Sequence, residues 1–288
     1  MHSSSKFIFT IYADDTSLLL TDTSLNSLHQ NLEQELILII SWLESNNLNL
    51  NLNKTNYILF QNRSRKYYIP QVIVKGEQVQ RVSHTKFLGL HIDENVNWSY
   101  HINEVCTKLS KICGVLYRVR DQLTTESLLS IYYTLCYPHL IYCVSIWSST
   151  WPSFLSKIFI AQNKIVRCIM FKKKFDSASC IYPQLNLLNF KFIKTYFVLL
   201  LIYKNVNIFP GKKLFTVLDS IRNTRSSNVN LVCPQFHTTS LYKNSVLCNS
   251  PQLWNSLPTH LKSLLCTNNV LQFIKKIKSY LYSCQSQS

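Results

Sequence analysis

Residues 6–20 read KFIFTIYADDTSLLL, two short runs of aromatic and β-branched residues around Ala13-Asp14-Asp15. Such runs on either side of a short polar segment predict a β-hairpin with its carboxylates at the turn. Adjacent carboxylates repel each other unless a cation lies between them. A hard divalent ion such as Mg²⁺ prefers carboxylate and phosphate oxygens and would meet that need. An ordinary Asp-Asp turn is the alternative for these residues taken alone.

The residues after the hairpin predict one helix and then further strands. Residues 24–45 predict an amphipathic helix, with Ser24 as its N-cap and a stop at Asn46-Asn47. Alternating Leu and Asn predict a half-buried strand over 48–60. Two more strands are expected at 71–74 and 86–92. The apolar stripe of the helix consists of Leu25, Leu28, Leu32, Leu36, Ile39 and Leu43.

From residue 98 onward the spacing of apolar residues becomes helical. Lys108, Lys111 and Arg118 lie together on the flank of the first stripe, and an ordinary solvated helix face is the alternative reading of these charges. Further helices are predicted at 124–147, 153–171 and 269–282, with a loop-rich region at 205–260 and a frayed tail from Gln285 to Ser288. The stripe of the first helix consists of Val105, Leu109, Ile112, Leu116 and Val119.

Composition narrows the class of protein. The chain has 288 residues, 30 Lys and Arg against 14 Asp and Glu, and a formal net charge of +16. This surplus indicates a polyanionic partner, either nucleic acid or an anionic membrane surface. Only 4 glycines are present, and they form neither a G-x-G-x-x-G motif nor a P-loop, which excludes the common nucleotide-binding cradles.

The 10 cysteines include no C-x-x-C motif, so they predict small buried side chains in a reducing compartment rather than a zinc site or a disulfide framework. Residues 127–156 contain no Lys, Arg, Asp or Glu, yet polar residues and Pro138 interrupt the apolar ones. We expect a buried helix pair there and no stable membrane insertion; an integral membrane protein is the third alternative.

Tyr12-Ala13-Asp14-Asp15, with apolar residues on both sides, resembles the catalytic hairpin of reverse transcriptases. Trp42 to Thr55, ending in Lys54-Thr55, resembles a palm segment of that family, and Thr85 to Asp93 resembles its primer-grip strand. Later segments resemble the thumb and C-terminal region of jockey-type non-LTR retrotransposon enzymes. These are Trp98 with His101 and Ile102, Tyr137 to Leu140 with Tyr142 and Trp147, and Leu253 to Pro258 with Phe273 to Lys275.

The resemblance implies an α+β fold: a partial polymerase palm at 1–95, a helical thumb at 96–175, and a helical and loop-rich C-terminal region at 176–288. It implies RNA-directed DNA polymerase activity by a two-metal-ion mechanism, with an RNA template and a DNA primer as partners. An intracellular ribonucleoprotein of the element, in cytoplasm and nucleus, is the implied location.

The resemblance also implies roles for individual residues. Asp14 would be a direct metal ligand and Asp15 a supporting carboxylate, while Tyr12 would lie under the primer end or the incoming nucleotide. Lys54 would protonate the departing pyrophosphate, although a solvated lysine is a close alternative. Phe87, Leu88 and Gly89 would position the primer. From their charge we expect Lys108, Lys111 and Arg118 to contact duplex phosphates.

The chain departs from the family pattern in one respect. A further metal-binding Asp normally precedes the hairpin, together with the fingers, and none of the eleven residues before Tyr12 is acidic. We therefore expect the chain to lack the N-terminal fingers, palm and endonuclease regions, and to be inactive alone. Mg²⁺ or Mn²⁺ would bind only if the missing palm carboxylate is supplied. A non-catalytic basic RNA- or DNA-binding remnant is the alternative.

Overall fold

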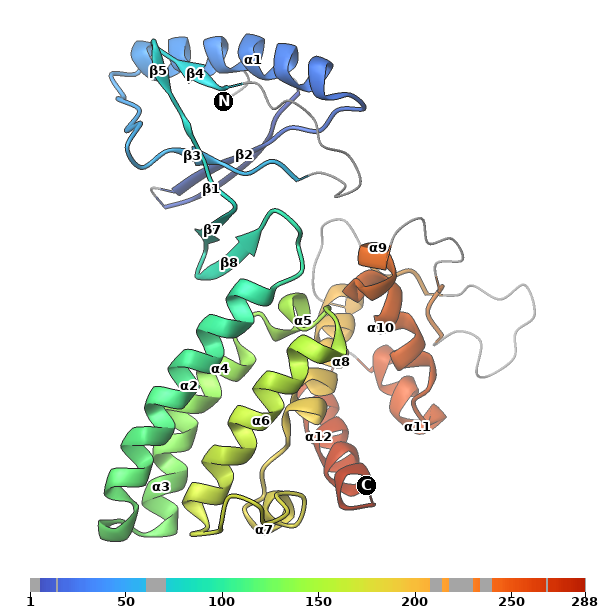
Figure 1. Cartoon of the computed structure of the whole chain (residues 1–288). Coiled ribbons are helices and arrows are strands. Elements are labelled where there is room, and N and C mark those ends of the chain that lie inside the picture. Colours follow the sequence, from blue (N-terminus) through green and yellow to red (C-terminus); the bar gives the residue numbers. More distant parts are fainter. Residues whose placement is uncertain are drawn as a thin grey trace, which may run out of the picture. The chain divides into compact units, whose positions relative to one another are not determined.

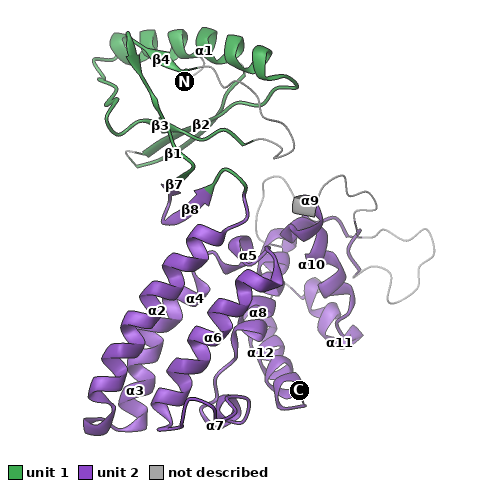
Figure 2. Cartoon of the chain, in the orientation of Figure 1, with its two compact units in different colours: residues 1–85, 93–95 green, residues 86–92, 96–288 purple. Residues whose placement is uncertain are grey.

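The computed structural model describes residues 6–13, 15–60, 71–207, 214–217, 230–233, 240–267 and 269–287. The chain divides into two compact units (Figure 2). Unit 1 comprises residues 1–85 and 93–95, and unit 2 comprises residues 86–92 and 96–288. Small sheets accompany many helices, which agrees with the predicted α+β class. The palm, thumb and C-terminal domains and their boundaries stay predictions.

Unit 1 begins with the predicted hairpin (Figure 1). Strands β1 (Ile8–Tyr12) and β2 (Asp15–Leu19) pair antiparallel and form a two-stranded sheet. Helix α1 (Leu25–Ser45) follows, and its N-cap Ser24 accepts a hydrogen bond from the Ser27 backbone N–H at 3.1 Å. The helix ends at Asn46, as expected. Both the hairpin and the helix prediction are confirmed.

The core of unit 1 is small. Its described centre consists of Val72, Val74 and Val79, on which apolar side chains of α1 pack. All six predicted stripe residues of α1 are only partly buried, whereas Glu35 is its one buried residue. The amphipathic pattern of α1 is therefore present, but little of it is covered within the described part of this unit.

The strand predicted over 48–60 is wrong for most of its length. Only β3 (Asn56–Tyr57) is a strand, and it pairs parallel with β6 (Gln80–Arg81). The preceding residues form a turn, in which Asn51 accepts hydrogen bonds from Lys54 and Thr55. Asparagine competes for local backbone hydrogen bonds in this way, and this competition overrides the period-two pattern.

The two later strand predictions have different outcomes. Strand β4 (Ile73–Val74) pairs with β5 (Glu77–Gln78) through the Lys75-Gly76 turn, as expected. The strand predicted over 86–92 is instead a hairpin of β7 (His84–Phe87) and β8 (Leu90–Asp93). Leu88 and Gly89 have φ angles of 46° and 83°, so the chain reverses there.

Unit 2 is a helical assembly, in which α2 (Ser99–Val119) packs along α6 (Pro152–Ile169) (Figure 1). The predicted stripe of α2 faces the core, with Leu109 and Leu116 fully buried. The helix predicted over 124–147 is broken at Cys143, whose φ is 49°. Its segments are α3 (Thr125–Ile131), the π-helical turn η2 (Tyr132–Cys136), α4 (Tyr137–Ile141) and α5 (Val144–Trp147).

Helix α8 (Phe190–Asn207) is central to unit 2 and contacts helices before and after it in the chain. The loop-rich prediction for 205–260 is wrong where α10 (Val246–Asn255) buries Trp254 in the core. Part of that region lies outside the described residues. The remaining described elements are η1 (Arg120–Gln122), α7 (Ile181–Gln184), α9 (Ser240–Asn244), α11 (Thr259–Lys262), η4 (Ser263–Cys266) and α12 (Val270–Gln287).

The prediction of a frayed tail is also wrong. Helix α12 continues to Gln287, and the buried Gln285 side chain accepts a hydrogen bond from Asn189 N at 2.8 Å. Its Nε2 donates to Leu187 O, also at 2.8 Å. The polar sequence of the tail suggested fraying, but the amide of Gln285 finds buried backbone partners that only the folded chain provides.

The cysteines and helices bear on the other sequence predictions. Nine cysteines of the described chain are free thiols, of which Cys136, Cys168 and Cys248 are buried and Cys180 is exposed. Burial raises the pKa of Cys136 to about 12, so its thiol stays protonated at neutral pH. Among the helices described here, none is both long and apolar enough to cross a membrane.

Candidate active site

The tip of the β1–β2 hairpin carries two of the predicted site residues. Tyr12 and Asp15 are directly paired across the hairpin. Ala13, which follows Tyr12, has a φ of 53°, a left-handed conformation that two-residue hairpin loops use. Asp14, the predicted direct metal ligand, lies outside the described residues. The hairpin therefore brings the Tyr12 ring and the Asp15 carboxylate together, because paired residues point to the same face of a sheet.

That face of the hairpin is open. Tyr12 is 65% exposed, and the pair Ile8 and Leu19, which lies on the same face, is also exposed. On the opposite face Phe9 and Leu18 are half-buried. The site face thus combines a carboxylate with an uncovered apolar surface, which is unusual for a sheet that has to bury one side.

The described residues do not form a metal centre. No group of three or more His, Cys, Asp or Glu side chains in the described part of the chain is placed to hold an ion. Of the described residues, Asp15 contributes an exposed carboxylate at the hairpin tip. A hard cation needs more oxygen ligands than this one group provides.

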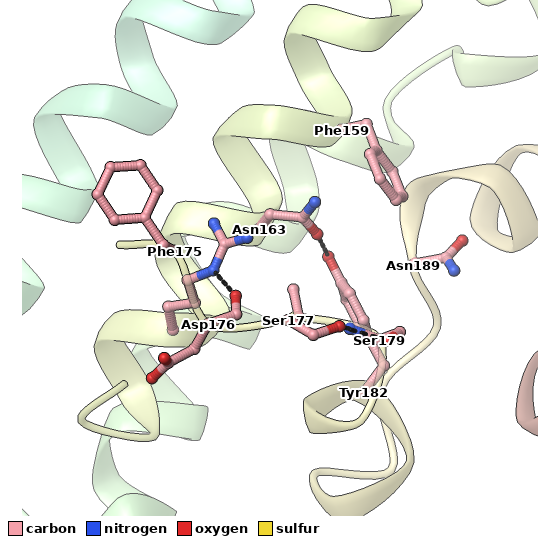
Figure 3. Close-up of a pocket in the computed structure, with 10 residues that line it drawn as sticks. Phe159, Asn163, Phe175, Asp176, Ser177, Ser179, Tyr182 and Asn189 are labelled. Atoms are coloured by element: carbon pink, nitrogen blue, oxygen red, sulfur yellow. Dashed lines mark hydrogen bonds between the residues drawn. The ribbon is translucent and has the colours of Figure 1, made fainter. Parts of the chain in front are cut away.

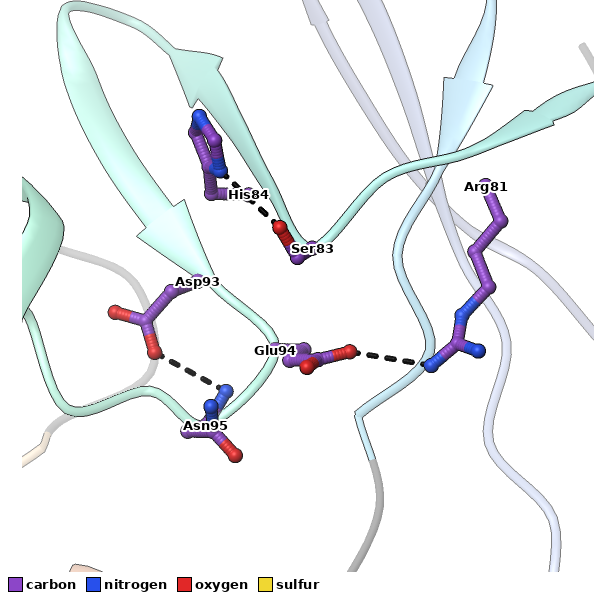
Figure 4. Close-up of polar contacts among 6 residues, drawn as sticks. All are labelled: Arg81, Ser83, His84, Asp93, Glu94 and Asn95. Carbon is purple, nitrogen blue, oxygen red and sulfur yellow. Dashed lines mark hydrogen bonds and ion pairs between the residues drawn. The ribbon is translucent and has the colours of Figure 1, made fainter. Parts of the chain in front are cut away.

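The acidic residues near residue 93 have structural partners (Figure 4). Glu94 pairs with Arg81 at 3.1 Å, and the buried Asp93 accepts a hydrogen bond from Asn95 N at 3.1 Å. The Glu94 backbone N–H donates to Ser83 O at 2.9 Å. These contacts give both carboxylates structural partners within the fold.

Lys54 lies in unit 1, in the turn that replaces the predicted strand. Its backbone N–H donates to Asn51 O at 3.1 Å, and its side chain is exposed. Among the described residues no hydrogen bond or ion pair is recorded between Lys54 and Asp15. The proposed role of Lys54 on the leaving pyrophosphate stays a prediction.

The predicted primer-positioning residues form the turn of the β7–β8 hairpin. The Tyr142 hydroxyl donates a hydrogen bond to Leu88 O. A Cβ on Gly89 would lie 3.3 Å from Tyr142 Cε1, so the tyrosine ring lies directly against the glycine. Gly89 therefore permits a close approach, as expected, but the group that approaches it in this structure is Tyr142. The sequence does not indicate this role of Tyr142, because 54 residues separate it from Leu88.

The rings of His101 and Trp147 support this turn through hydrogen bonds and ring contacts. His101 Nδ1 accepts a hydrogen bond from the His91 backbone N–H at 3.4 Å, and its ring lies 5.5 Å from that of Trp147. Trp147 Nε1 in turn donates to Tyr142 O at 2.7 Å. Burial, reinforced by the charges of His91 and Lys108, lowers the pKa of His101 to about 4. A neutral imidazole is therefore held between β8 and α5 at physiological pH.

The three predicted phosphate contacts lie on α2. Lys108, Lys111 and Arg118 are all exposed, on the side away from the buried stripe. Arg118 Nε donates to Gly114 O at 3.4 Å. This basic flank of α2, defined by the three residues, could contact phosphates but has no geometry specific to nucleic acid.

Comparison with known proteins finds one class, the RNA-directed DNA polymerases of mobile elements. One relative is the polymerase from mobile element jockey of Drosophila melanogaster, 28% identical over 162 residues, which are 55% of this chain and 17% of the relative. The jockey polymerase of Drosophila funebris is 25% identical over an equal length. A probable polymerase from transposon BS of Drosophila melanogaster is 22% identical over 185 residues, 63% of this chain.

The matched segments cover only 17–20% of the length of these relatives. No family model matches the chain. No solved structure matches it either. The resemblance to polymerases of jockey and other non-LTR elements, stated from the motifs, is nevertheless confirmed.

Proposed function

We propose that this chain is part of the RNA-directed DNA polymerase of a mobile element and acts on an RNA template and a DNA primer. The observation that carries the proposal is the hairpin tip, where Tyr12 and Asp15 are paired on an open face. Similarity to jockey polymerases supports it.

The roles of individual residues follow from this proposal. Asp14 and Asp15 would bind divalent metal ions at the primer end, with Tyr12 beneath the reacting nucleotide. In this class of reaction the ions activate the attacking hydroxyl and stabilise the leaving pyrophosphate. The Leu88-Gly89 turn would hold the primer backbone, and the basic flank of α2 would contact duplex phosphates.

The chain by itself should not polymerise. The described residues provide one carboxylate at the hairpin tip and no third ligand, and the open apolar face of the hairpin suits further palm strands. Primer extension by the isolated chain with Mg²⁺, if abolished by Asp14→Asn, would contradict this part of the proposal.

A chimera tests the polymerase proposal itself. Residues 6–175 would replace the matching segment of a full-length jockey polymerase, and extension of a DNA primer on an RNA template would be measured. We expect synthesis that Asp15→Asn reduces by at least about a hundredfold. Asp121→Asn, at an exposed carboxylate on another part of the chain, is the matched control and should retain activity. Equal activity of both variants would refute the role of Asp15.

The alternative is a basic nucleic-acid binder without catalysis, and the comparisons do not favour it. It predicts that binding is all that the chain contributes, so a chimera would bind the template and primer but fail to extend the primer.

A further inference from the structure

A pocket of about 290 Å³ opens beside α6 in unit 2 (Figure 3). One wall comes from α6, through Phe159, Asn163 and Arg167, and the other from the loop after α6 and from α7. It shares no residue with the β1–β2 hairpin, the Leu88-Gly89 turn or the basic flank of α2. Its volume is close to the lower limit of small-molecule sites, roughly 300 Å³, and suits a single nucleotide rather than a double helix.

The polar groups of this pocket favour an anion. Arg167 Nε donates to Asp176 O at 2.7 Å, which fixes the guanidinium at the wall. Within the described chain, no residue accepts a hydrogen bond from its two terminal nitrogens. The hydroxyls of Ser177 and Ser179, in the same pocket lining, are hydrogen-bonded to each other at 2.6 Å, which leaves one O–H to donate to a ligand. A planar guanidinium with free N–H groups is well suited to bind phosphate.

Among the described residues of the pocket lining, Asp176 carries the one carboxylate, and its contacts lie on the Lys173 side. Asp176 Oδ2 accepts a hydrogen bond from the Lys173 backbone N–H at 2.8 Å. Figure 3 shows this carboxylate directed away from Asn163 and Tyr182. Lys172, Lys173 and Lys174 are exposed in the same loop, so the potential around the opening is positive.

Two aromatic rings complete the pocket, at opposite sides in Figure 3. Phe159 is partly exposed on α6, whereas Phe175 is 91% exposed, an extreme value for so large an apolar side chain. The Lys174 ammonium lies 5.5 Å from the centre of the Phe175 ring. Because the Phe175 ring is so exposed, it remains available for stacking. An unpaired nucleobase can stack on such a ring.

We propose that this pocket binds one nucleotide of a single-stranded RNA or DNA segment, with its phosphate at Arg167 and its base on Phe175. Paired bases are already stacked within a duplex and cannot reach the ring, so the site selects single strands. The binding needs no metal ion and no hairpin carboxylate. It therefore does not depend on the polymerase proposal.

Fluorescence anisotropy tests the proposal on the full chain in EDTA. The probes are labelled oligo(dT), labelled oligo(U) and a DNA duplex of equal length. We expect Phe175→Ala to weaken binding of at least one single strand by about tenfold and to leave duplex binding unchanged. The matched control is Phe171→Ala, because Phe171 is also exposed but does not line the pocket. It should have no effect.

A second pair of variants avoids the Arg167 contact that holds the loop in place. Ser177→Asp introduces a charge that repels phosphate and should weaken single-strand binding by about tenfold. Ser283→Asp makes the same change at an exposed position on α12 and should not. The proposal would be overturned if the pocket variant and its control lost the same affinity in either pair, or if duplex binding fell as much as single-strand binding. Such results would indicate only general attraction to a basic surface. Asp15→Asn should bind like the parent chain, which separates this test from that of the polymerase.

Discussion

Helices α1 and α2 are both 21 residues long, and both have apolar side chains at spacings of three and four. Helix α2 buries five side chains, including Ile102, Leu109 and Leu116 with no exposed surface, whereas α1 buries only Glu35. The difference comes from their partners. Helix α2 packs along α6 within a continuous core, while α1 contacts a small cluster around Val72 and Val74. Similar spacing of apolar residues therefore does not give equal burial, because burial requires a complementary surface.

Unit 1 accordingly presents apolar side chains to solvent on several elements. Ile8 and Tyr12 on the hairpin, Ile37 and Leu38 on α1, and Ile73 on β4 are all exposed. Exposed apolar side chains of this kind are available for contact with a partner surface. Under the proposed function, further palm strands would cover the hairpin face. Unit 2 has a continuous core around α8, although it too leaves apolar side chains such as Phe175 and Leu271 exposed.

The largest expected effect is on the core of unit 2. Trp147 is fully buried, and its ring stacks on that of Phe190 at a centroid distance of 5.6 Å. We expect Trp147→Ala to lower the free energy of unfolding by about 3–5 kcal/mol, because it leaves a cavity and removes the hydrogen bond from Trp147 Nε1 to Tyr142 O. Ile37→Ala in unit 1, at a side chain that is 66% exposed, should change it by less than about 0.5 kcal/mol.

Urea unfolding measured by circular dichroism and tryptophan fluorescence checks both values. Trp151→Ala provides a control at a partly exposed tryptophan in the same unit and should cost clearly less than Trp147→Ala. If Trp147→Ala and Ile37→Ala had similar effects, the contrast between the two units would be wrong.

The next effect is a dependence on pH that arises in unit 2. Because burial lowers the pKa of His101 from 6.5 to about 4, the unfolded chain binds a proton between these values while the folded chain does not. The free energy of unfolding should therefore fall as the pH is lowered from 6.5 towards 4, and be insensitive to this group above 6.5. In His101→Asn the new amide oxygen can accept the hydrogen bond from the His91 N–H. This variant should lose the part of the pH dependence that corresponds to uptake of about one proton on unfolding.

Urea titrations at several pH values measure this slope. Part of the slope should remain in His101→Asn, because burial also lowers the pKa of His139. His260→Asn, at an exposed position on α11, is the control and should leave the slope unchanged. An unchanged slope in His101→Asn would show that the imidazole is not held neutral.

The smallest effect compares one glycine from each unit. Gly76 and Gly89 have similar φ angles, 81° and 83°, so alanine is strained at both by about 1 kcal/mol. Only at Gly89 would the new Cβ meet a neighbour, the Tyr142 ring, within 4 Å. Gly89→Ala should displace that ring from Leu88 O and cost about 1 kcal/mol more.

Hydrogen exchange at the two turns measures the difference, which we expect to be about fivefold in the exchange rate. In a Tyr142→Ala background the two alanine variants should become equivalent. A persistent difference in that background would mean that the Tyr142 contact is not its cause.

Much of the local structure could be predicted from the sequence. The hairpin at 8–19, the capped helix α1 and the stripes of α2 and α12 all follow from side-chain periodicity and end signals. Two predictions failed where a polar side chain decides the outcome. Asn51 Oδ1 accepts a local hydrogen bond from Lys54 N in place of a strand, and Gln285 found buried partners where a frayed tail was expected. Periodicity does not contain this information, because it depends on which backbone groups lie nearby.

The candidate site shows the same limit. Pairing of Tyr12 with Asp15 was predictable, because a tight hairpin brings residues three apart in sequence together. The support of the Leu88-Gly89 turn was not, since His101 lies on α2, Trp147 on α5 and Tyr142 in the turn between α4 and α5. No local pattern encodes a contact across 54 residues.

The sequence by itself determined the first hairpin and helices α1, α2, α6 and α12 of this chain, its strongly basic charge, and its likeness to polymerases of mobile elements, because these properties depend on residue types and spacings within short segments. Only the tertiary structure decided that α2 is buried while α1 is mostly uncovered, that Tyr142 holds the Leu88-Gly89 turn, and that Arg167 and Phe175 line one pocket. These properties depend on which surfaces meet when the chain packs, and burial and contact are consequences of that packing rather than of any one segment.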